Sequence, residues 1–319
     1  MAEESESHLT EAAREALALP IEERIRYVRR DRWIGYPKAE EALNKLESLY
    51  THPKIDRMPC MLLVSDTNNG KTTIVNRFQR EWHPPHDNPD GDAIIYPVMV
   101  VQAPPVPDEG RFLDGILEIL SAPYRSRDKP AKKMFEVIKL FKQIQLVLLI
   151  IDEIHNILAG STRNQHNFRN VIRYLSNELK ISIAGAGTRE ALNAITTDPQ
   201  LTNRFKPFFL PRWTIADGKH PEKDPYLRFL VSYERTLPLR NPSNLANPKN
   251  PAVALKLLSM SEGLLGELVD LLKQAAVEAI KSGRERIDLK LLEKIDWIPP
   301  KDRKRIIETK KQTAAAESA

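Results

Sequence analysis

Short apolar runs alternate with segments of helical periodicity between Cys60 and Trp213, and this alternation limits the possible folds more than any other feature. Neighbouring parallel strands need crossover connections, so the pattern predicts an α/β fold: a parallel sheet with helices on both faces. Burial on both faces explains why the run LVLLII does not alternate. The expected strands lie in CMLLVS, AIIYPVMVV, QLVLLIID, ISIAGAG and PFFLPRW, with helices between them, for example at 71–82 and 111–120.

Helical spacing also predicts helices on either side of this region. The pattern from 9 to 33 is interrupted at Leu19 and Pro20, because proline ends one helix or starts the next, and a second helix follows at 38–50. After Trp213, helical pieces at 224–236, 252–259, 264–282 and 289–295 indicate a small helical domain. We therefore expect an N-terminal helical extension (1–32), an α/β domain (33–215), a helical domain (216–298) and a basic tail (299–319). The first six residues and the tail are expected to be disordered, because they offer little to bury.

Charge and cysteine usage limit the compartment and the partners. Lys and Arg number 48 against 43 acidic residues, and the net charge of +5 permits nucleic-acid binding without requiring it. Basic residues gather at 24–33, 124–133 and 301–311, where a solvated face or tail is the alternative to a binding surface. The single cysteine, Cys60, excludes an internal disulfide, no signal segment opens the chain, and the apolar run 146–151 is too short to cross a bilayer. We expect a cytoplasmic protein without a membrane role.

The segment SDTNNGKT, residues 65–72, follows a predicted strand and precedes a predicted helix, the context of a Walker A phosphate-binding loop. Backbone N–H groups and the dipole at that helix start favour an anion, and Lys71 is expected to reach the β- and γ-phosphates. Ser65 stands where such loops usually have glycine, which leaves the shape of the first turn open. An ordinary turn before a helix is the alternative. The expected ATP-binding residues are Asp66, Thr67, Asn68, Asn69, Gly70, Lys71, Thr72 and Thr73.

Two adjacent carboxylates, Asp152 and Glu153, end the run LVLLIIDE. Acids at the end of a buried strand are costly unless they serve a cation or a proton transfer. The Thr72 hydroxyl is expected to hold Mg²⁺, Asp152 to coordinate the ion through its water shell as a Walker B carboxylate does, and Glu153 to activate the attacking water. The alternative is that the two acids only occupy the N-terminus of a helix, where negative charge is favourable. His155 has no second His or Cys at a ligand spacing, so no metal role is assigned to it.

The order of these motifs resembles the core of AAA+ ATPases, a five-stranded parallel sheet flanked by helices with a small C-terminal helical lid. The stretches DTNNGKTTI, LLIIDEIHNIL, IAGAGTREA and SEGLLGELVDLLKQAA resemble the TniB and TnsC family of transposition ATPases. The resemblance covers most of residues 33–295. It implies a bacterial, Mg²⁺-dependent ATPase that forms an ATP-dependent ring or filament on duplex DNA and links a target-selection protein of the TniQ type to a transposase.

Further roles follow from the resemblance, each with an alternative. Thr188 occupies the place of a sensor-1 residue or caps a helix. Arg204 occupies the place of an arginine finger that reaches a neighbouring subunit's nucleotide, or is a surface arginine. Ile34 and Tyr36 lie where such proteins enclose the adenine, or form an aromatic core contact. A sensor-2 arginine is missing, and the nearest cation is Lys273, which favours slow turnover.

Contacts to DNA are expected on phosphates, with little reading of bases. The candidates follow the second expected strand, and no spacing argument chooses among them: Arg111, Arg125, Arg127, Lys129, Lys132 and Lys133. Two other functions remain open, an AAA+ helicase-loader-like ATPase and a nucleotide-gated scaffold with little turnover. A small-molecule kinase lacks support, because no substrate-binding arginine cluster or phosphate lid follows the motifs.

Overall fold

The computed structural model describes residues 8–92, 94–196, 199–215 and 221–303, and these form two compact units. One unit is Lys38–Pro211, and the other combines Met1–Pro37 with Arg212–Ala319. The N-terminal helices therefore group with the C-terminal helices, whereas the sequence pattern predicts two separate parts. The disorder expected for the first six residues, and for the tail beyond residue 303, falls outside the described residues. No helix in the described ranges is long and apolar enough to cross a membrane.

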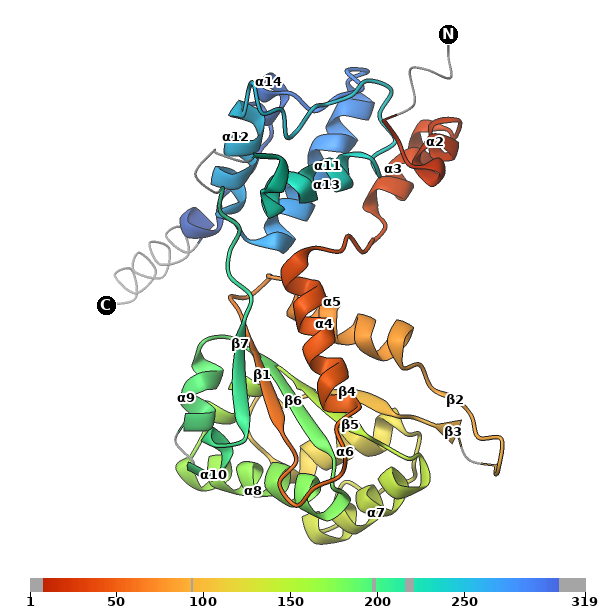
Figure 1. The fold of residues 1–319 in the computed structure, drawn as a ribbon, viewed down its shortest axis with the longest axis vertical. Helices are drawn as coiled ribbons and strands as arrows, with labels where there is room; N and C mark the ends of the chain where they lie inside the picture. The colour runs from red at the N-terminus through yellow and green to blue at the C-terminus, as the bar shows by residue number, and fades with distance from the viewer. Residues whose placement is uncertain (1–7, 93, 197–198, 216–220, 304–319) are drawn as a thin grey trace, which may run out of the picture. The chain divides into compact units, whose positions relative to one another are not determined.

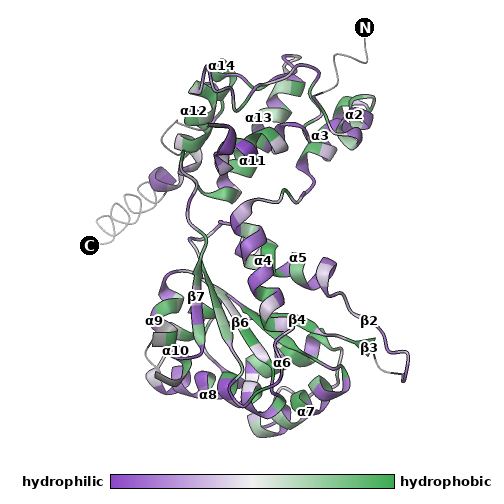
Figure 2. Ribbon diagram, viewed as in Figure 1, coloured by the Kyte–Doolittle hydropathy of each residue, from purple (hydrophilic) through white to green (hydrophobic). Residues whose placement is uncertain are grey.

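The unit Lys38–Pro211 is an α/β domain whose sheet is flanked by helices (Figure 1). Hydrophobic residues concentrate in the strands (Figure 2), as the sequence pattern predicts for strands buried on both faces. Its elements in chain order are α4 (Pro37–Tyr50), β1 (Cys60–Val64), α5 (Lys71–Arg77), η1 (Phe78–Trp82), β2 (His86–Asp87), β3 (Ile94–Ile95), β4 (Val98–Gln102), α6 (Glu109–Ile119), α7 (Pro130–Gln143), β5 (Leu148–Asp152), η2 (Ile154–Leu158), α8 (Thr162–Leu179), β6 (Ser182–Gly187), α9 (Glu190–Thr196), α10 (Pro199–Thr202) and β7 (Phe205–Phe209).

Five strands form one parallel sheet in the order β4-β5-β6-β1-β7. The predicted five-stranded parallel sheet is confirmed. Because all five strands run the same way, the ends of β1, β5 and β6 meet at one edge, where ligands bind in open α/β sheets. Strand β6 lies between β1, which leads into the loop 65–70, and β5, which ends at Asp152.

The expected second strand, AIIYPVMVV, divides into two. Ile94 and Ile95 pair with His86 and Asp87 in a small antiparallel hairpin, and β4 begins only at Val98. Pro97 separates the two segments, because it fixes φ and has no N–H to donate to a ladder. The predicted single strand was therefore wrong in its first half.

Small residues in β6 allow η2 to cross close over the sheet. A Cβ on Gly185 would lie 2.7 Å from Ile154 Cδ1 and 3.0 Å from Leu62 Cδ1, and a Cβ on Gly187 would lie 3.3 Å from the backbone nitrogen of His155. The chain after Asp152 therefore crosses closely over β6. The run ISIAGAG is small-residue-rich for this packing reason.

The second unit is helical. Its elements are α2 (Glu11–Leu17), α3 (Ile21–Arg29), η3 (Pro221–Lys223), α11 (Pro225–Glu234), α12 (Ala252–Ser261), α13 (Leu265–Lys281) and α14 (Leu289–Leu292). The interruption predicted at Leu19 and Pro20 separates α2 from α3, and the four predicted C-terminal helices are present with small changes at their ends. The helical C-terminal region expected of an AAA+ lid is therefore confirmed.

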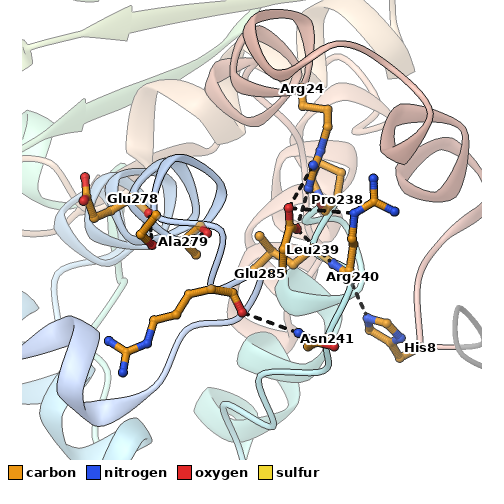
Figure 3. A network of polar contacts seen from close by, with 11 residues as sticks. His8, Arg24, Pro238, Leu239, Arg240, Asn241, Glu278, Ala279 and Glu285 are labelled. Carbon is orange, nitrogen blue, oxygen red and sulfur yellow. Dashed lines mark hydrogen bonds and ion pairs between the residues drawn. The ribbon is translucent and has the colours of Figure 1, made fainter.

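A buried ion pair joins the N-terminal helices of this unit to its C-terminal part (Figure 3). Arg24 on α3 donates to both carboxylate oxygens of Glu285, at 3.0 and 2.6 Å, and to the carbonyl oxygen of Pro238 at 2.7 Å. The backbone N–H of Arg240 donates to the same carboxylate at 3.2 Å. His8 contacts the carbonyl oxygen of Leu239 at 3.2 Å. The N-terminal segment is thus an integral part of the helical unit.

Candidate functional site

The loop between β1 and α5 takes the shape of a phosphate-binding loop. Gly70 precedes α5 with φ 85°, and Asn68 has φ 58°, a left-handed conformation that asparagine tolerates better than most residues. Asn69 serves differently: its buried amide donates to the carbonyl oxygens of Leu210 and Pro211, at 3.1 and 3.3 Å. The loop is therefore tied to the end of β7 at the position where it turns toward α5.

Ser65 continues the sheet instead of opening the turn. Its backbone N–H donates to the carbonyl oxygen of Gly187 at 3.2 Å, and its hydroxyl donates to the carbonyl oxygen of Asp66 at 3.0 Å. Ser65 is not among the described residues with positive φ. A side chain at this position is consequently tolerated, although such loops usually have glycine there.

The Lys71 ammonium is buried inside the loop. Its Nζ donates to the carbonyl oxygens of Ser65 and Asp66, at 3.1 and 2.9 Å, and to the Ser65 hydroxyl at 3.2 Å. Burial lowers the pKa of Lys71, while the negative charges of Glu153, Asp152 and Asp66 oppose that shift. A phosphate at the loop would compete with these loop oxygens for the three N–H donors of the ammonium.

Thr72 and Asp152 meet across β6. The Thr72 hydroxyl donates to Asp152 Oδ2 at 2.7 Å, and Asp152 Oδ1 accepts from the Glu153 backbone N–H at 2.9 Å. Neighbouring oxygens in an octahedral Mg²⁺ shell lie about 2.9 Å apart, given metal–oxygen distances of about 2.0–2.1 Å. The two hard oxygen atoms therefore fit Mg²⁺ ligation. The described residues hold no group of three metal-binding side chains, so phosphate and water would complete the shell.

Glu153 sits in a left-handed backbone conformation, with φ 54°, directly before η2. Its half-buried carboxylate lies 3.2 Å from His155 Nδ1, a contact that becomes an ion pair when the imidazole is protonated. Sequence reasoning missed this proximity, because a spacing of two residues brings the side chains together only when the backbone turns back. Positive φ at a non-glycine residue costs energy, and such positions concentrate at functional sites.

Thr188 and Arg204 lie at the ends of the elements predicted for them. The Thr188 hydroxyl, directly after β6, donates to Glu190 Oε2 at 3.4 Å. Arg204, directly before β7, is half-exposed and donates to Asn177 Oδ1 on α8 at 2.8 Å. The sensor-1 and arginine-finger roles stay predictions.

Tyr36 and Ile34 belong to the helical unit, where Tyr36 forms an aromatic core contact. Its ring centroid lies 4.9 Å from that of Trp213 and 6.4 Å from that of Phe229, and burial raises the pKa of its hydroxyl to about 12. The core alternative thus describes Tyr36, and adenine enclosure stays a prediction. Lys273 lies 2.7 Å from Asp31 in the same unit, so its charge already has a partner.

Five of the six expected DNA contacts are exposed, and Lys133 is not. The exposed residues are Arg111, Arg125, Arg127, Lys129 and Lys132. Lys133 is only 4% exposed, and its ammonium lies 2.7 Å from Asp114 Oδ1 and 3.1 Å from the carbonyl oxygen of Ser126. Its assignment to DNA was wrong, because the side chain turns inward and anchors the loop between α6 and α7.

Comparisons with known proteins agree with this geometry. A family model described as Bacterial TniB protein matches residues 24–215, more than half of the chain. No curated protein matches the sequence.

Solved structures with the same fold include the Aeropyrum pernix ORC2 protein in its ADPNP-ADP complexes, at 17% identity and a TM-score of 0.57, covering 84% of this chain and 70% of that one. Cdc6p from Pyrobaculum aerophilum has 14% identity and a TM-score of 0.53, covering 82% and 67%. A Walker-type ATPase of Pyrococcus abyssi has 16% identity and a TM-score of 0.50, covering 87% and 73%. The fold is that of AAA+ ATPases.

Proposed function

Because this chain belongs to the TniB family, we propose that it is an ATPase of DNA transposition. It binds ATP with Mg²⁺, oligomerises on duplex DNA, and links a target-selection protein of the TniQ type to the transposase. The observation that carries the ATPase part is the 2.7 Å contact between Thr72 and Asp152 beside the buried Lys71 ammonium. Family membership supports the transposition part.

Each residue of the site has one task in this proposal. The loop N–H groups and Lys71 bind the phosphates, and Thr72 and Asp152 hold the cation. A Mg²⁺ ion held by these two residues would neutralise charge on the β- and γ-phosphates. Glu153, the residue that follows β5, accepts a proton from the attacking water.

Assembly follows from Arg204. A finger supplied by a neighbouring copy stabilises negative charge that develops on the γ-phosphate, so ATP bridges two copies and hydrolysis weakens the interface. DNA phosphates would be bound by the exposed cations of the loop between α6 and α7, Arg125, Arg127 and Lys129. Without base contacts, the preference for sequence would be weak.

One observation favours a second candidate, a nucleotide-gated scaffold with little turnover. The helix α13 has no arginine, and its Lys273 is held by Asp31 at 2.7 Å. Lys273 would have to leave Asp31 to stabilise a transition state, and α13 has no arginine to take that role. Glu153 argues against this candidate, since a scaffold needs no general base.

Two substitutions test the proposal. Lys71→Ala removes charge-assisted hydrogen bonds worth about 1.5–3 kcal/mol, so ATP affinity should fall about 10- to 150-fold and assembly on DNA should be lost. Glu153→Gln should preserve assembly and prolong it, because binding remains while proton transfer is lost. Nucleotide titration measures ATP affinity, and negative-stain imaging with duplex DNA measures assembly with a non-hydrolysable ATP analogue and the lifetime of the assembly with ATP.

Lys54→Ala, a change of the same kind at an exposed position outside the site, is the matched control. If the Lys71 and Glu153 variants assemble and disassemble like the parent, the mechanism is wrong. A Glu153→Gln chain that disassembles at the parent's rate while assembling normally favours the scaffold.

A further inference from the structure

The two most exposed large hydrophobic side chains among the described residues lie on different elements of the α/β unit. Phe135 on α7 is 67% exposed, and Ile94 on β3 is 57% exposed. Single exposed apolar residues need no explanation, but Phe135 lies on a helix face with three lysines, and Ile94 lies in a hairpin with three aspartates. These two sets of charges are opposite in sign.

Phe135 lies in a basic stripe on α7. Lys132, Phe135, Lys139 and Lys142 follow one another at spacings of three, four and three residues, which places them on one face of the helix. We call these four residues the α7 face. Lys132 and Lys142 make only exposed ion pairs, at 3.0 Å to Asp128 and 3.1 Å to Glu178, and such pairs exchange partners at little cost. Half-buried Glu136 is the one acid on α7 itself.

Ile94 lies in the hairpin formed by β2 and β3. Between residues 84 and 96 the chain has three aspartates and no lysine or arginine. Asp87, Asp90 and Asp92 are exposed, and together with Ile94 we call them the acidic arm. Asn88 closes the turn, accepting at its side-chain oxygen from the Asp90 N–H at 3.1 Å.

The base of the hairpin is fixed, whereas three of its four strand residues, His86, Asp87 and Ile94, are exposed. His83 stacks on Tyr50 with ring centroids 3.7 Å apart, and its Nε2 lies 2.6 Å from Glu47 Oε2, so α4 holds the start of the arm. Each strand of the hairpin has only two residues. A two-stranded hairpin is marginally stable alone in water, so an arm of this size gains order by packing against a partner.

We propose that the acidic arm of one copy docks on the α7 face of a second copy, with Ile94 against Phe135 and the aspartates against the lysines. The aspartates of the acidic arm are opposite in charge to the lysines of the α7 face, and each surface has one exposed apolar side chain. These two matches favour the arm as the partner of the α7 face. A contact made by the four side chains of the acidic arm buries far less than the roughly 1,200 Å² of a stable interface, so the contact adds to another interface. The inference thus rests on the proposed self-assembly, and names a contact that the nucleotide does not touch.

Duplex DNA is the competing occupant of the α7 face, and charge reversal distinguishes the two. Asp90→Lys with Asp92→Lys adds positive charge, which would strengthen binding to phosphates but weakens docking onto lysines. We expect the protein concentration at half-assembly, measured by sedimentation with a non-hydrolysable ATP analogue and no DNA, to rise about three- to thirtyfold. Lys132→Glu with Lys139→Glu should have the same effect, and the chain with all four changes should return to within about twofold of the parent.

Phe135→Ser should also weaken assembly about tenfold, with ATP affinity of the lone chain unchanged. Leu255→Ser, at an apolar helix residue that is 50% exposed in the other unit, is the matched control and should leave assembly unchanged. If the parent assembles and neither charge-reversal pair nor Phe135→Ser changes the protein concentration at half-assembly, the docking inference is overturned. That outcome leaves the proposed function intact.

Cross-linking detects the contact between the acidic arm and the α7 face even if nucleotide does not drive assembly. A mixture of Ile94→Cys and Phe135→Cys chains at high concentration should form linked pairs, and buried Cys60 adds no background. If the parent does not assemble when ATP is added, the proposed self-assembly is refuted. Absence of linked pairs, whatever the parent does with ATP, refutes the docking of the arm.

Discussion

Replacement of Arg24 by methionine tests whether the packing of the N-terminal helices contributes to the stability of the helical unit. Arg24 is buried and makes three hydrogen bonds, two to Glu285 and one to the carbonyl oxygen of Pro238 (Figure 3). Methionine preserves most of the apolar stem and removes the charge. The side chain of Glu285 is only 12% exposed, so its carboxylate would remain nearly buried with the exposed Arg240 guanidinium, 3.9 Å away, as its remaining cation.

The expected cost follows from that burial. Removing one partner of a buried ion pair costs about 3–5 kcal/mol, and the partial exposure of Glu285 argues for about 3. Since whole domains are stable by about 5–15 kcal/mol, this is a large fraction. We expect the melting temperature to fall by about 6–12 °C, and amide protons of α2 and α3 to exchange faster than those of the sheet. Thermal denaturation and hydrogen exchange measure the two effects.

The pH dependence gives a second readout. Burial raises the pKa of Glu285, but hydrogen bonds from Arg24 and the Arg240 backbone N–H, with the charges of both arginines, lower it further than burial raises it. A carboxyl with a depressed folded pKa contributes stability above its unfolded pKa of about 4.5, and that stability is lost as pH falls through the folded value. The gap between parent and Arg24→Met should therefore narrow below about pH 4.5.

The double variant Arg24→Met with Glu285→Gln is the control, and it should recover part of the loss because no buried charge is left without a partner. Equal melting temperatures for parent and Arg24→Met would refute the reasoning. A stability gap that stays constant from pH 7 to pH 3 would show that packing, and not the ion pair, is the source of the effect.

Three further outcomes follow from the α/β unit. Gly185→Ala places a Cβ 2.7 Å from Ile154 Cδ1, so denaturation should show a loss of about 1–3 kcal/mol, and kinetics should show turnover falling more than ATP affinity as η2 shifts. Lys133→Met should lower the free energy of unfolding by about 3 kcal/mol but leave the dependence of DNA affinity on salt concentration unchanged. Arg127→Ala should lower the slope of that dependence by about one. If filter-binding titrations give the same slope for the two variants, the inward assignment of Lys133 is contradicted. Arg204→Ala should spare ATP binding by lone chains and lower turnover of the assembly, and unchanged turnover in a steady-state assay would remove the finger assignment.

The elements of the sheet were predictable because burial on both faces leaves a strong sequence signal. The run LVLLII predicts a buried strand from its composition alone. A GKT triplet between a strand and a helix is typical of a phosphate-binding loop. The direction of a single lysine carries no such signal. Lys133 and Lys132 are neighbours in the sequence, yet one turns inward to Asp114 and the other outward. Only the packing of α6 against α7 decides between them.

The hairpin before β4 escaped prediction for a related reason. A run of apolar letters such as AIIYPVMVV is consistent with one strand, and Pro97 was the signal that it contains two. Proline cannot donate to a ladder, so it belongs at the start of a strand or at an edge. Ile94 is exposed because its short strand pairs only with β2, away from the five-stranded sheet.

The serine at the first position of the phosphate-binding loop shows how position within a sheet changes what a motif requires. Glycine is needed where the backbone enters positive φ or must approach a ligand closely. Here the sheet extends one residue further, since the Ser65 N–H still bonds to Gly187, and the loop turns only at Asn68 and Gly70. The strict requirement for glycine therefore falls on Gly70 alone. A side chain at Ser65 adds a hydroxyl that accepts from the Lys71 ammonium, which helps to hold that ammonium beside the Thr72–Asp152 pair.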